Sequence, residues 1–259
     1  MIGAIVGDMA GSIYEWHNIK TKEFPLFSSG SRFTDDTVMT VAVASALLEG
    51  GRESDFIKAM QRLGRAFPRA GYGGNFARWI QDSKPRPYNS FGNGSAMRVS
   101  PVGWFCDDLE SVERVAALSA GVTHNHPEGI RGAQAVASAI FLARTEHDKA
   151  AIKRHIEDRY GYNLNRRLDD IRLFYRFDVS CQGSVPEAII AYLESTDFED
   201  AIRNAVSIGG DSDTIAAIAG SIAEAEYGVP DAIRAEAVAR LAPVLREALE
   251  RFESAIGLK

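Results

Sequence analysis

The stretch 38–48 is apolar on nearly every side of a helix, and it constrains the fold more than any other part of the sequence. A helix that is hydrophobic all round is buried, so this one has to lie among other helices. It ends at Gly50 and Gly51, a typical glycine stop. Two aspartates, Asp35 and Asp36, stand directly before it. The pattern predicts a central helix that begins at a pair of carboxylates.

Helical periodicity recurs along most of the chain. In 54–67 the apolar residues trace one face, and Pro68 follows the end. The same pattern predicts helices over 75–81, 108–120, 128–145, 148–159, 186–195, 198–206, 214–227 and 231–256. The best strand candidate, 174–179, is short and interrupted by polar residues. Since no linker, charge block or repeat divides the sequence, we expect an all-α chain with one compact multi-helix domain over 1–259.

Composition and charge narrow the class of protein. With 259 residues, 46% hydrophobic and 25% charged, the chain has ordinary globular proportions. The net charge of −6 argues against nucleic acid as the main partner. No apolar run approaches the ~20 residues that span a bilayer, and no secretory leader opens the sequence. Cys106 and Cys181 lie far apart without CxxC spacing, which favours reduced, buried thiols. We expect a cytoplasmic monomer.

Two short acidic clusters each precede an apolar helix. They read Thr34-Asp35-Asp36-Thr37 and Asp211-Ser212-Asp213-Thr214. One interpretation is N-capping, because carboxylates and hydroxyls accept hydrogen bonds from free helix amides. A cap needs only one side-chain oxygen, however, and packed carboxylates repel unless a cation screens them. Oxygen-only ligands suit Mg²⁺, Mn²⁺ or Ca²⁺. If both helices begin at one cleft, the clusters could hold two metal ions.

Glycine-rich loops supply further candidates. Residues 71–75 and 91–98 both lead into predicted helices, where free backbone amides can bind a phosphate or simply form turns. Arg98 could hold its loop or contact a phosphate. Residues 7–12 resemble a loose phosphate loop without the GK[ST] ending, and glycines at 3, 7 and 11 also suit close helix packing.

Two other positions could carry chemistry. Glu15 lies between Tyr14 and Trp16, where an aromatic environment could raise the pKa of its carboxyl and suit it to acid–base catalysis; an exposed glutamate at a helix end is the alternative. His124 and His126 have neither a cysteine nearby nor an HExxH motif, which argues against zinc. Contact with a base or ribose, or a turn closed by Pro127, explains them better.

Six segments in order make the chain resemble the ADP-ribosylglycohydrolase superfamily, which includes the dinitrogenase-reductase-activating glycohydrolases. The segments are GAIVGDMAGSIYEW, SRFTDDTVMTVAVASALL, RAGYGGNFARWI, FGNGSAMRVSPVGWF, VTHNHPEG and NAVSIGGDSDTIAAIAGSIAEAEYG. They extend from residue 2 to about 228, and the paired TDDT and GGDSDT motifs are the most specific. The resemblance implies an all-α fold with a central binuclear metal cleft.

The resemblance also implies roles for individual residues. Two divalent cations, Mg²⁺ or Mn²⁺, are expected, and Asp213 is expected to contact both. The implied metal ligands are Thr34, Asp35, Asp36, Asp211, Asp213 and Thr214. The implied catalytic residues are Glu15, Asp35 and Asp36. The implied substrate-binding residues are Gly73, Gly74, Asn75, Phe91, Gly92, Asn93, Gly94, Ser95, Met97 and His124.

The implied activity is metal-dependent hydrolysis of the N- or O-glycosidic bond between ADP-ribose and a protein side chain or small-molecule acceptor. The alternative is a catalytically silent ADP-ribose-binding, immunity or regulatory protein on the same scaffold. Some arginine-directed members have an aspartate near 71–75. This chain has none there, which weakens the case for arginine as the acceptor.

Overall fold

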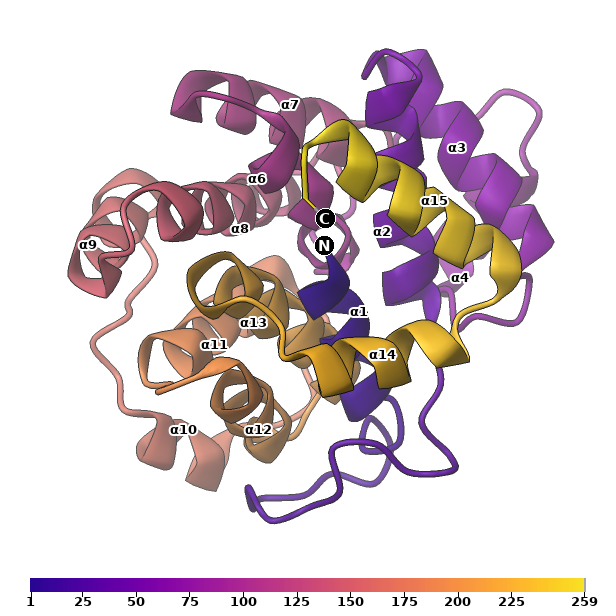
Figure 1. Ribbon diagram of the computed structural model, residues 1–259. Helices are drawn as coiled ribbons and strands as arrows, with labels where there is room; N and C mark the ends of the chain where they lie inside the picture. Colours follow the sequence, from indigo (N-terminus) through magenta and orange to yellow (C-terminus); the bar gives the residue numbers. More distant parts are fainter. Residues whose placement is uncertain (259) are drawn as a thin grey trace.

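The computed structural model describes residues 1–258, and this part of the chain forms fifteen helices (Figure 1). They are α1 (Ile2–Gly11), α2 (Asp35–Leu48), α3 (Glu53–Ala66), α4 (Gly74–Gln81), α5 (Gly94–Met97), α6 (Ser100–Phe105), α7 (Leu109–Gly121), α8 (Pro127–Thr145), α9 (Lys149–Tyr160), α10 (Leu168–Phe174), α11 (Cys181–Leu193), α12 (Phe198–Ile208), α13 (Ser212–Tyr227), α14 (Asp231–Arg240) and α15 (Pro243–Ala255). Over 1–258 there is no strand, and the one isolated β-bridge joins Gly92 to Ser180. The all-α prediction is confirmed.

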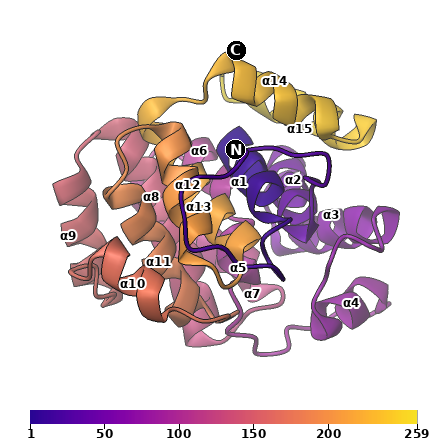
Figure 2. The ribbon, with the colours of Figure 1, turned by 90° about the horizontal axis from the view of Figure 1, so that it is seen from below.

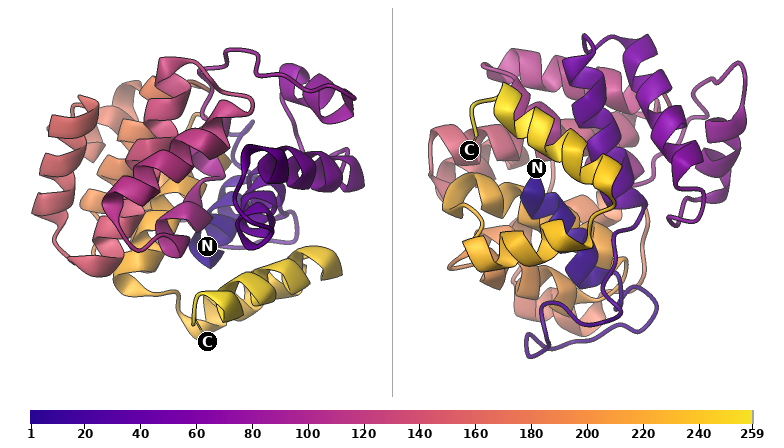
Figure 3. Two further views of the ribbon diagram at one scale, coloured as in Figure 1. Left: turned by 90° about the horizontal axis from the view of Figure 1, so that it is seen from above. Right: turned by 45° about the vertical axis from the view of Figure 1, so that its right-hand side comes forward.

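Helices α1, α2 and α13 form the centre of the molecule. Every residue of α1 is buried, as is α13 from its first residue to Ala225, and most of α2. Helices α8, α11 and α12 pack around α13, and α3 packs against α2. The last two helices, α14 and α15, lie across this group as an outer layer (Figures 2 and 3). The central helix expected at 38–48 is therefore where its apolar surface requires it to be.

Helices α1 and α13 approach so closely that only glycine fits between their backbones. A Cβ atom on Gly7 would lie 2.0 Å from the carbonyl oxygen of Ala216, and one on Gly3 would lie 2.2 Å from that of Gly220. The packing interpretation of the glycines at 3, 7 and 11 is thus supported. At the N-terminal end of α1, the Glu224 carboxylate of α13 accepts hydrogen bonds from the Ile2 and Gly3 amides, at 3.2 and 2.8 Å.

Most predicted helices are present, with differences at turns. The continuous helix expected over 231–256 is wrong: the chain breaks at 241–242 and restarts at Pro243, because proline has no N–H to continue a helix and favours its first turn. Helix α11 begins at Cys181, five residues before the predicted start, and includes Pro186. The sequence analysis did not delimit α1, α5, α6 and α10 as helices.

The two cysteines and the length of the apolar helices can also be compared with the sequence-based expectations. Cys106 and Cys181 are both free and buried, as predicted. Within the described residues, none of the helices is long and apolar enough to cross a membrane.

We expect Gly7→Ala to lower the free energy of unfolding by about 1–3 kcal/mol, because the new methyl group would meet backbone atoms of α13 that cannot move aside. Gly121→Ala is the matched control. A Cβ there would meet nothing within 4 Å, so this helical glycine should gain up to about 1 kcal/mol from alanine's higher propensity. Urea unfolding of both variants measures the difference, and equal stabilities would contradict the close-packing account.

Candidate metal centre and substrate cleft

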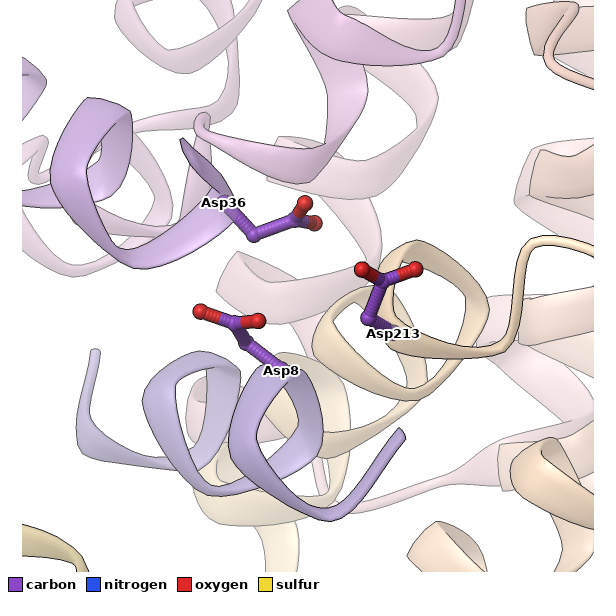
Figure 4. Close-up of side chains that lie close together, drawn as sticks. All are labelled: Asp8, Asp36 and Asp213. Atoms are coloured by element: carbon purple, nitrogen blue, oxygen red, sulfur yellow. The ribbon is translucent and has the colours of Figure 1, made fainter. Parts of the chain in front are cut away.

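Three buried carboxylates from three helices point toward one another at the centre of the molecule (Figure 4). Asp8 lies in α1, Asp36 in the first turn of α2 and Asp213 in the first turn of α13. One carboxylate oxygen of each lies within 4.8 Å of those of the other two. Glu15, Asp211 and Asp213 form a second set with the same spacing. Asp213 therefore belongs to both sets.

The capping of α2 is carried out by other side chains than Asp35 and Asp36. Thr34 Oγ1 accepts a hydrogen bond from the Asp36 amide at 3.3 Å. The Asp8 carboxylate accepts from the amides of Thr34 and Thr37, at 2.8 and 3.1 Å. Asp36 is thus not needed as a cap, and its buried Oδ1 has no hydrogen-bond partner. A buried carboxylate oxygen without a partner is a group that an ion or an ordered water would satisfy.

The second acidic cluster caps its helix only in part: Asp213 Oδ1 accepts from the Thr214 amide in the first turn of α13 at 3.0 Å. Asp211 occupies the N-cap position of α13, but its side chain makes no capping hydrogen bond. It accepts instead from Asn93 Nδ2 at 2.7 Å. Thr214 Oγ1 donates to Asp36 Oδ2 at 3.3 Å, which joins the starts of α13 and α2. Capping therefore accounts for neither Asp36 nor Asp211, and a cation site is the interpretation that the geometry of these two carboxylates favours.

Burial without a counter-charge shifts the titration of these carboxyl groups. Desolvation, followed by repulsion from Asp8, raises the pKa of Asp35 to about 7. Desolvation and neighbouring carboxylates raise the pKa values of Asp36 and Asp213 well above the ordinary value. Among residues 1–258, none of the ion pairs involves a member of either carboxylate set. Without a cation from outside the chain, this cluster is neutralised only by protonation of its own carboxyl groups.

The donor set fits a divalent metal that prefers oxygen. Both sets consist of carboxylates, with the Thr34 and Thr214 hydroxyls beside them, and neither contains a cysteine or histidine. Oxygen-only sites suit Mg²⁺, Mn²⁺ and Ca²⁺ rather than zinc. Two sets that share Asp213 match the expectation that one aspartate contacts two ions. The number and identity of the ions stay predictions.

Five carboxylates line part of an open cavity of about 440 Å³, here called the cleft: Glu15, Asp35, Asp36, Asp211 and Asp213; Asp8 does not line it. It extends from the segment after α1 and the starts of α2 and α13 to the loops before α4 and α5 and to the segment before α8. Its lining contains fourteen of the residues predicted from the sequence: Glu15, Asp35, Asp36, Gly73, Gly74, Asn75, Gly92, Asn93, Gly94, Met97, His124, Asp211, Asp213 and Thr214. The structure therefore brings most of the predicted metal, catalytic and substrate-binding residues to one place.

Three predicted site residues do not line the cleft. Thr34 is buried behind the carboxylates and donates to Asp8 Oδ1 at 2.7 Å. Ser95 is buried and donates to the Gly129 carbonyl at 2.7 Å. Phe91 is half exposed and its ring packs edge-on against His126. Thr34 and Ser95 support their neighbours here, and Phe91 stands beside the opening.

The glycine loop before α4 serves the carboxylates as well as the cleft. Gly71 has φ +121°, and a Cβ on it would lie 2.9 Å from Asp35 Oδ1. Any side chain at this position would push Asp35 out of place. At Gly73 and Gly74 a Cβ would meet nothing within 4 Å, so the backbone there faces open space. This part of the loop leaves room for a ligand to approach the main chain.

Asp8 is the member of the first carboxylate set that the sequence did not single out. It is the one charged residue in α1, whose other nine residues are apolar or glycine, and it is fully buried. That isolation was the available signal. The aromatic pair at the mouth of the cleft was also missed: Trp16, 73% exposed, stacks on Phe177 at 5.3 Å between ring centroids. No sequence signal joins two residues so far apart in the chain.

The fold and the site together define an all-α protein built around a cluster of buried carboxylates beside a cleft, with an oxygen-only donor set that suits a divalent cation. The ADP-ribosylglycohydrolase family model matches residues 1–258, and the chain belongs to this family.

Similar proteins agree with this assignment. Human ADP-ribosylhydrolase ARH3 is 28% identical, with 88% of this chain and 84% of that protein covered. ADP-ribosylarginine hydrolase Tri1 of Pseudomonas putida is 27% identical, with 88% and 70% covered. A solved structure titled "ADP-ribosylglycohydrolase-related protein complex" superposes with a TM-score of 0.73 at 24% identity, covering 98% of this chain and 95% of that one, and it supports the fold.

We expect Mg²⁺ or Mn²⁺ to raise the melting temperature above that in EDTA. At a cation concentration ~100-fold above Kd the gain is about 2.7 kcal/mol, or roughly 5–10 °C for a chain of this size. Asp213→Asn should abolish most of the gain, because Asp213 belongs to both carboxylate sets. Glu250→Gln, at an exposed position on α15, is the control. Differential scanning calorimetry measures all three, and a full cation response in Asp213→Asn would exclude this site.

In EDTA we expect the melting temperature to fall as the pH rises from about 5 to about 8. The carboxyl pKa values are raised in the folded state, so the folded chain binds more protons than the unfolded one in this window and loses stability as they dissociate. Asp36→Asn removes one of these groups. It should raise the melting temperature at pH 8 in EDTA and reduce the slope; an unchanged value at pH 8 would show that the cluster carries no repulsion.

Proposed function

We propose that this chain is a divalent-metal-dependent hydrolase that cleaves the N- or O-glycosidic bond between ADP-ribose and a protein side chain or small-molecule acceptor. The observation that carries the proposal is the pair of carboxylate sets that share Asp213 at one end of a cleft bounded by glycine loops. Membership of the ADP-ribosylglycohydrolase family and similarity to the two named ADP-ribosylhydrolases support it.

The proposed metal ligands are the six of the sequence analysis together with Asp8. Thr34, Asp35 and Asp36 would serve one Mg²⁺ or Mn²⁺ ion, Asp211 and Thr214 the other, and Asp213 both. Asp8 faces Asp36 and Asp213 directly, which is why we add it. The bound cations would supply Lewis-acid stabilisation of negative charge and lower the pKa of water in the cleft.

The chain's own carboxylates supply the proton chemistry in this proposal. Hydrolysis passes through a transition state with positive charge on the anomeric carbon, and nearby carboxylates stabilise that charge. Asp35 and Asp36 both line the cleft, and we assign to one of them the acceptance of the proton of an attacking water. Glu15 stands at the mouth of the cleft, and burial together with Asp211 raises the pKa of its carboxyl. It is suited to exchange a proton with the leaving acceptor.

The nucleotide part of the substrate is placed at the other end of the cleft. We propose that 73–75 and 91–97 hold the diphosphate and adenosine, with His124 beside them. The open backbone at Gly73 and Gly74 supports this position, since a phosphate can approach amides that no side chain covers. We further propose that the chain acts as one domain over 1–259, as a monomer and in the cytoplasm, where the two free buried thiols would remain reduced.

The test is release of ADP-ribose from modified arginine and serine peptides, with Mg²⁺, Mn²⁺ or EDTA. We expect release with a cation and none in EDTA. Asp35→Asn should reduce kcat by roughly 10²–10⁴-fold, as for loss of a general base. Glu250→Gln should retain full activity because its side chain is exposed away from the cleft. Comparing the two peptides identifies the acceptor.

The alternative, a silent ADP-ribose-binding, immunity or regulatory protein, predicts a different pattern. Such a protein would bind ADP-ribose tightly in calorimetry yet release none from either peptide with either cation. That result would exclude hydrolysis of the arginine and serine linkages, favour a binding role and leave the binding site intact. Loss of both binding and release would overturn the assignment of the cleft itself.

A further inference from the structure

A buried guanidinium without a carboxylate partner lies behind the nucleotide end of the cleft. Arg98 is 1% exposed and follows α5. Over residues 1–258 no ion pair involves it, and its Nε atom has no hydrogen-bond partner. Its Nη2 atom donates to the Ser119 carbonyl at 3.1 Å and to Thr123 Oγ1 at 2.8 Å. The Phe76 ring lies against it at 5.7 Å.

The Thr123 hydroxyl connects this cation to His124. Its oxygen lies 2.7 Å from His124 Nδ1 and 3.5 Å from the Ala120 carbonyl. A guanidinium can only donate, so Thr123 Oγ1 has to accept from Arg98. Its single hydrogen then goes to one of two acceptors, and the bond to His124 Nδ1 is much the shorter. A hydrogen bond at 3.5 Å is weak by comparison.

The charge of Arg98 favours the same direction of donation. With Nδ1 unprotonated, the lone pair of the ring is directed toward the hydroxyl that the guanidinium polarises. With Nδ1 protonated, a partial positive charge would face that cation instead. Burial and then the Arg98 charge also lower the pKa of His124 well below its usual value, which keeps the ring neutral. A neutral ring whose Nδ1 accepts a hydrogen bond carries its proton on Nε2.

The other ring nitrogen faces the glycine loop of the cleft. His124 is buried and lines the cleft, and a Cβ on Gly94 would lie 3.2 Å from Nε2. A Cβ on Gly92 would lie 3.6 Å from it. The two glycines thus leave Nε2 open to the cleft, where any other residue would cover it.

From these contacts we infer that Arg98 acts through Thr123 to fix His124 as the Nε2–H tautomer, a neutral hydrogen-bond donor directed into the cleft. Arg98 and Thr123 are positioning residues, and His124 is the group that contacts the ligand. The ligand atom that it recognises is a hydrogen-bond acceptor on the nucleotide. Only this last step rests on the proposed function; the tautomer is a property of the chain alone.

The tautomer can be measured directly by ¹⁵N NMR of the histidine rings in the full chain without ligand. We expect His124 to show an acceptor-type Nδ1 and a protonated Nε2, with its signals assigned by their absence from His124→Gln. Thr123→Val removes the hydroxyl and keeps the shape, so it should give a mixture of tautomers. Thr123→Ser restores the hydroxyl and should restore the wild-type signals. A protonated Nδ1 in the wild type, or unchanged signals in Thr123→Val, would overturn the inference.

Binding of ADP-ribose supplies the second measurement. Calorimetry should show about tenfold weaker binding for Thr123→Val and wild-type binding for Thr123→Ser, since one directed hydrogen bond is lost and regained. Thr40→Val is the matched control: this threonine is also fully buried, and its hydroxyl donates only to the Met97 carbonyl at 3.4 Å. An equal loss of ADP-ribose affinity in Thr40→Val and Thr123→Val would mean that altered packing weakens binding. It would contradict a positioning role for Thr123.

Arg98→Met tests whether the Arg98 guanidinium is what fixes the tautomer of His124. It removes the charge and the donor, and it should shift His124 toward the same mixture of tautomers as Thr123→Val. If this variant does not fold, the Thr123 pair still decides, because neither of those changes alters a charge. If the wild-type protein does not bind ADP-ribose at all, the proposed function fails, and the ¹⁵N signals continue to test the tautomer on their own.

Discussion

The close contact between α1 and α13 is the constraint on which the rest of the structure depends. Glycines on α1 meet backbone atoms of α13, so the distance between the helix axes is set by main chain against main chain. This contact brings Asp8 next to Asp213, whose helix start is linked to α2 through the Thr214–Asp36 hydrogen bond. Loss of the contact would separate the carboxylates, and the cleft would have no acidic end.

The second feature that organises the site is a division of tasks at the start of α2. Asp8 and Thr34 satisfy the amides that any helix start leaves free. The carboxylate of Asp36 is thereby released from that role while remaining fully desolvated. A charged oxygen that is buried, unpaired and surrounded by like charges is unfavourable in the absence of a cation. The stability of the fold and the occupancy of the proposed metal site are consequently linked.

Sequence reasoning located the parts of the site that are local in the chain. The TDDT and DSDT clusters stand at helix starts, and their oxygen chemistry can be recognised from a few neighbouring residues. Asp8 was missed because it lies inside a helix, where the glycine spacing around it indicated packing rather than chemistry. The stacking of Trp16 on Phe177, and the line of contacts from Arg98 to His124, depend on distances across the fold that no local pattern contains. The break at 241–242 was missed because apolar periodicity continued on both sides of it.

The contact between α1 and α13 also makes the proposed cation site depend on the register of these two helices. Glu224 accepts hydrogen bonds from the amides at the N-terminal end of α1, and Asp213 lies close to Asp8 toward the C-terminal end. The two helices are therefore in contact at two points along their length. Small substitutions anywhere along this seam would slide or tilt one helix against the other. Such a shift would move Asp8 relative to Asp213. It would thereby change the affinity for Mg²⁺ or Mn²⁺ even when the substituted residue does not line the cleft. If the proposed cations bind here, their affinity therefore depends on how closely α1 and α13 pack as well as on the carboxylates themselves.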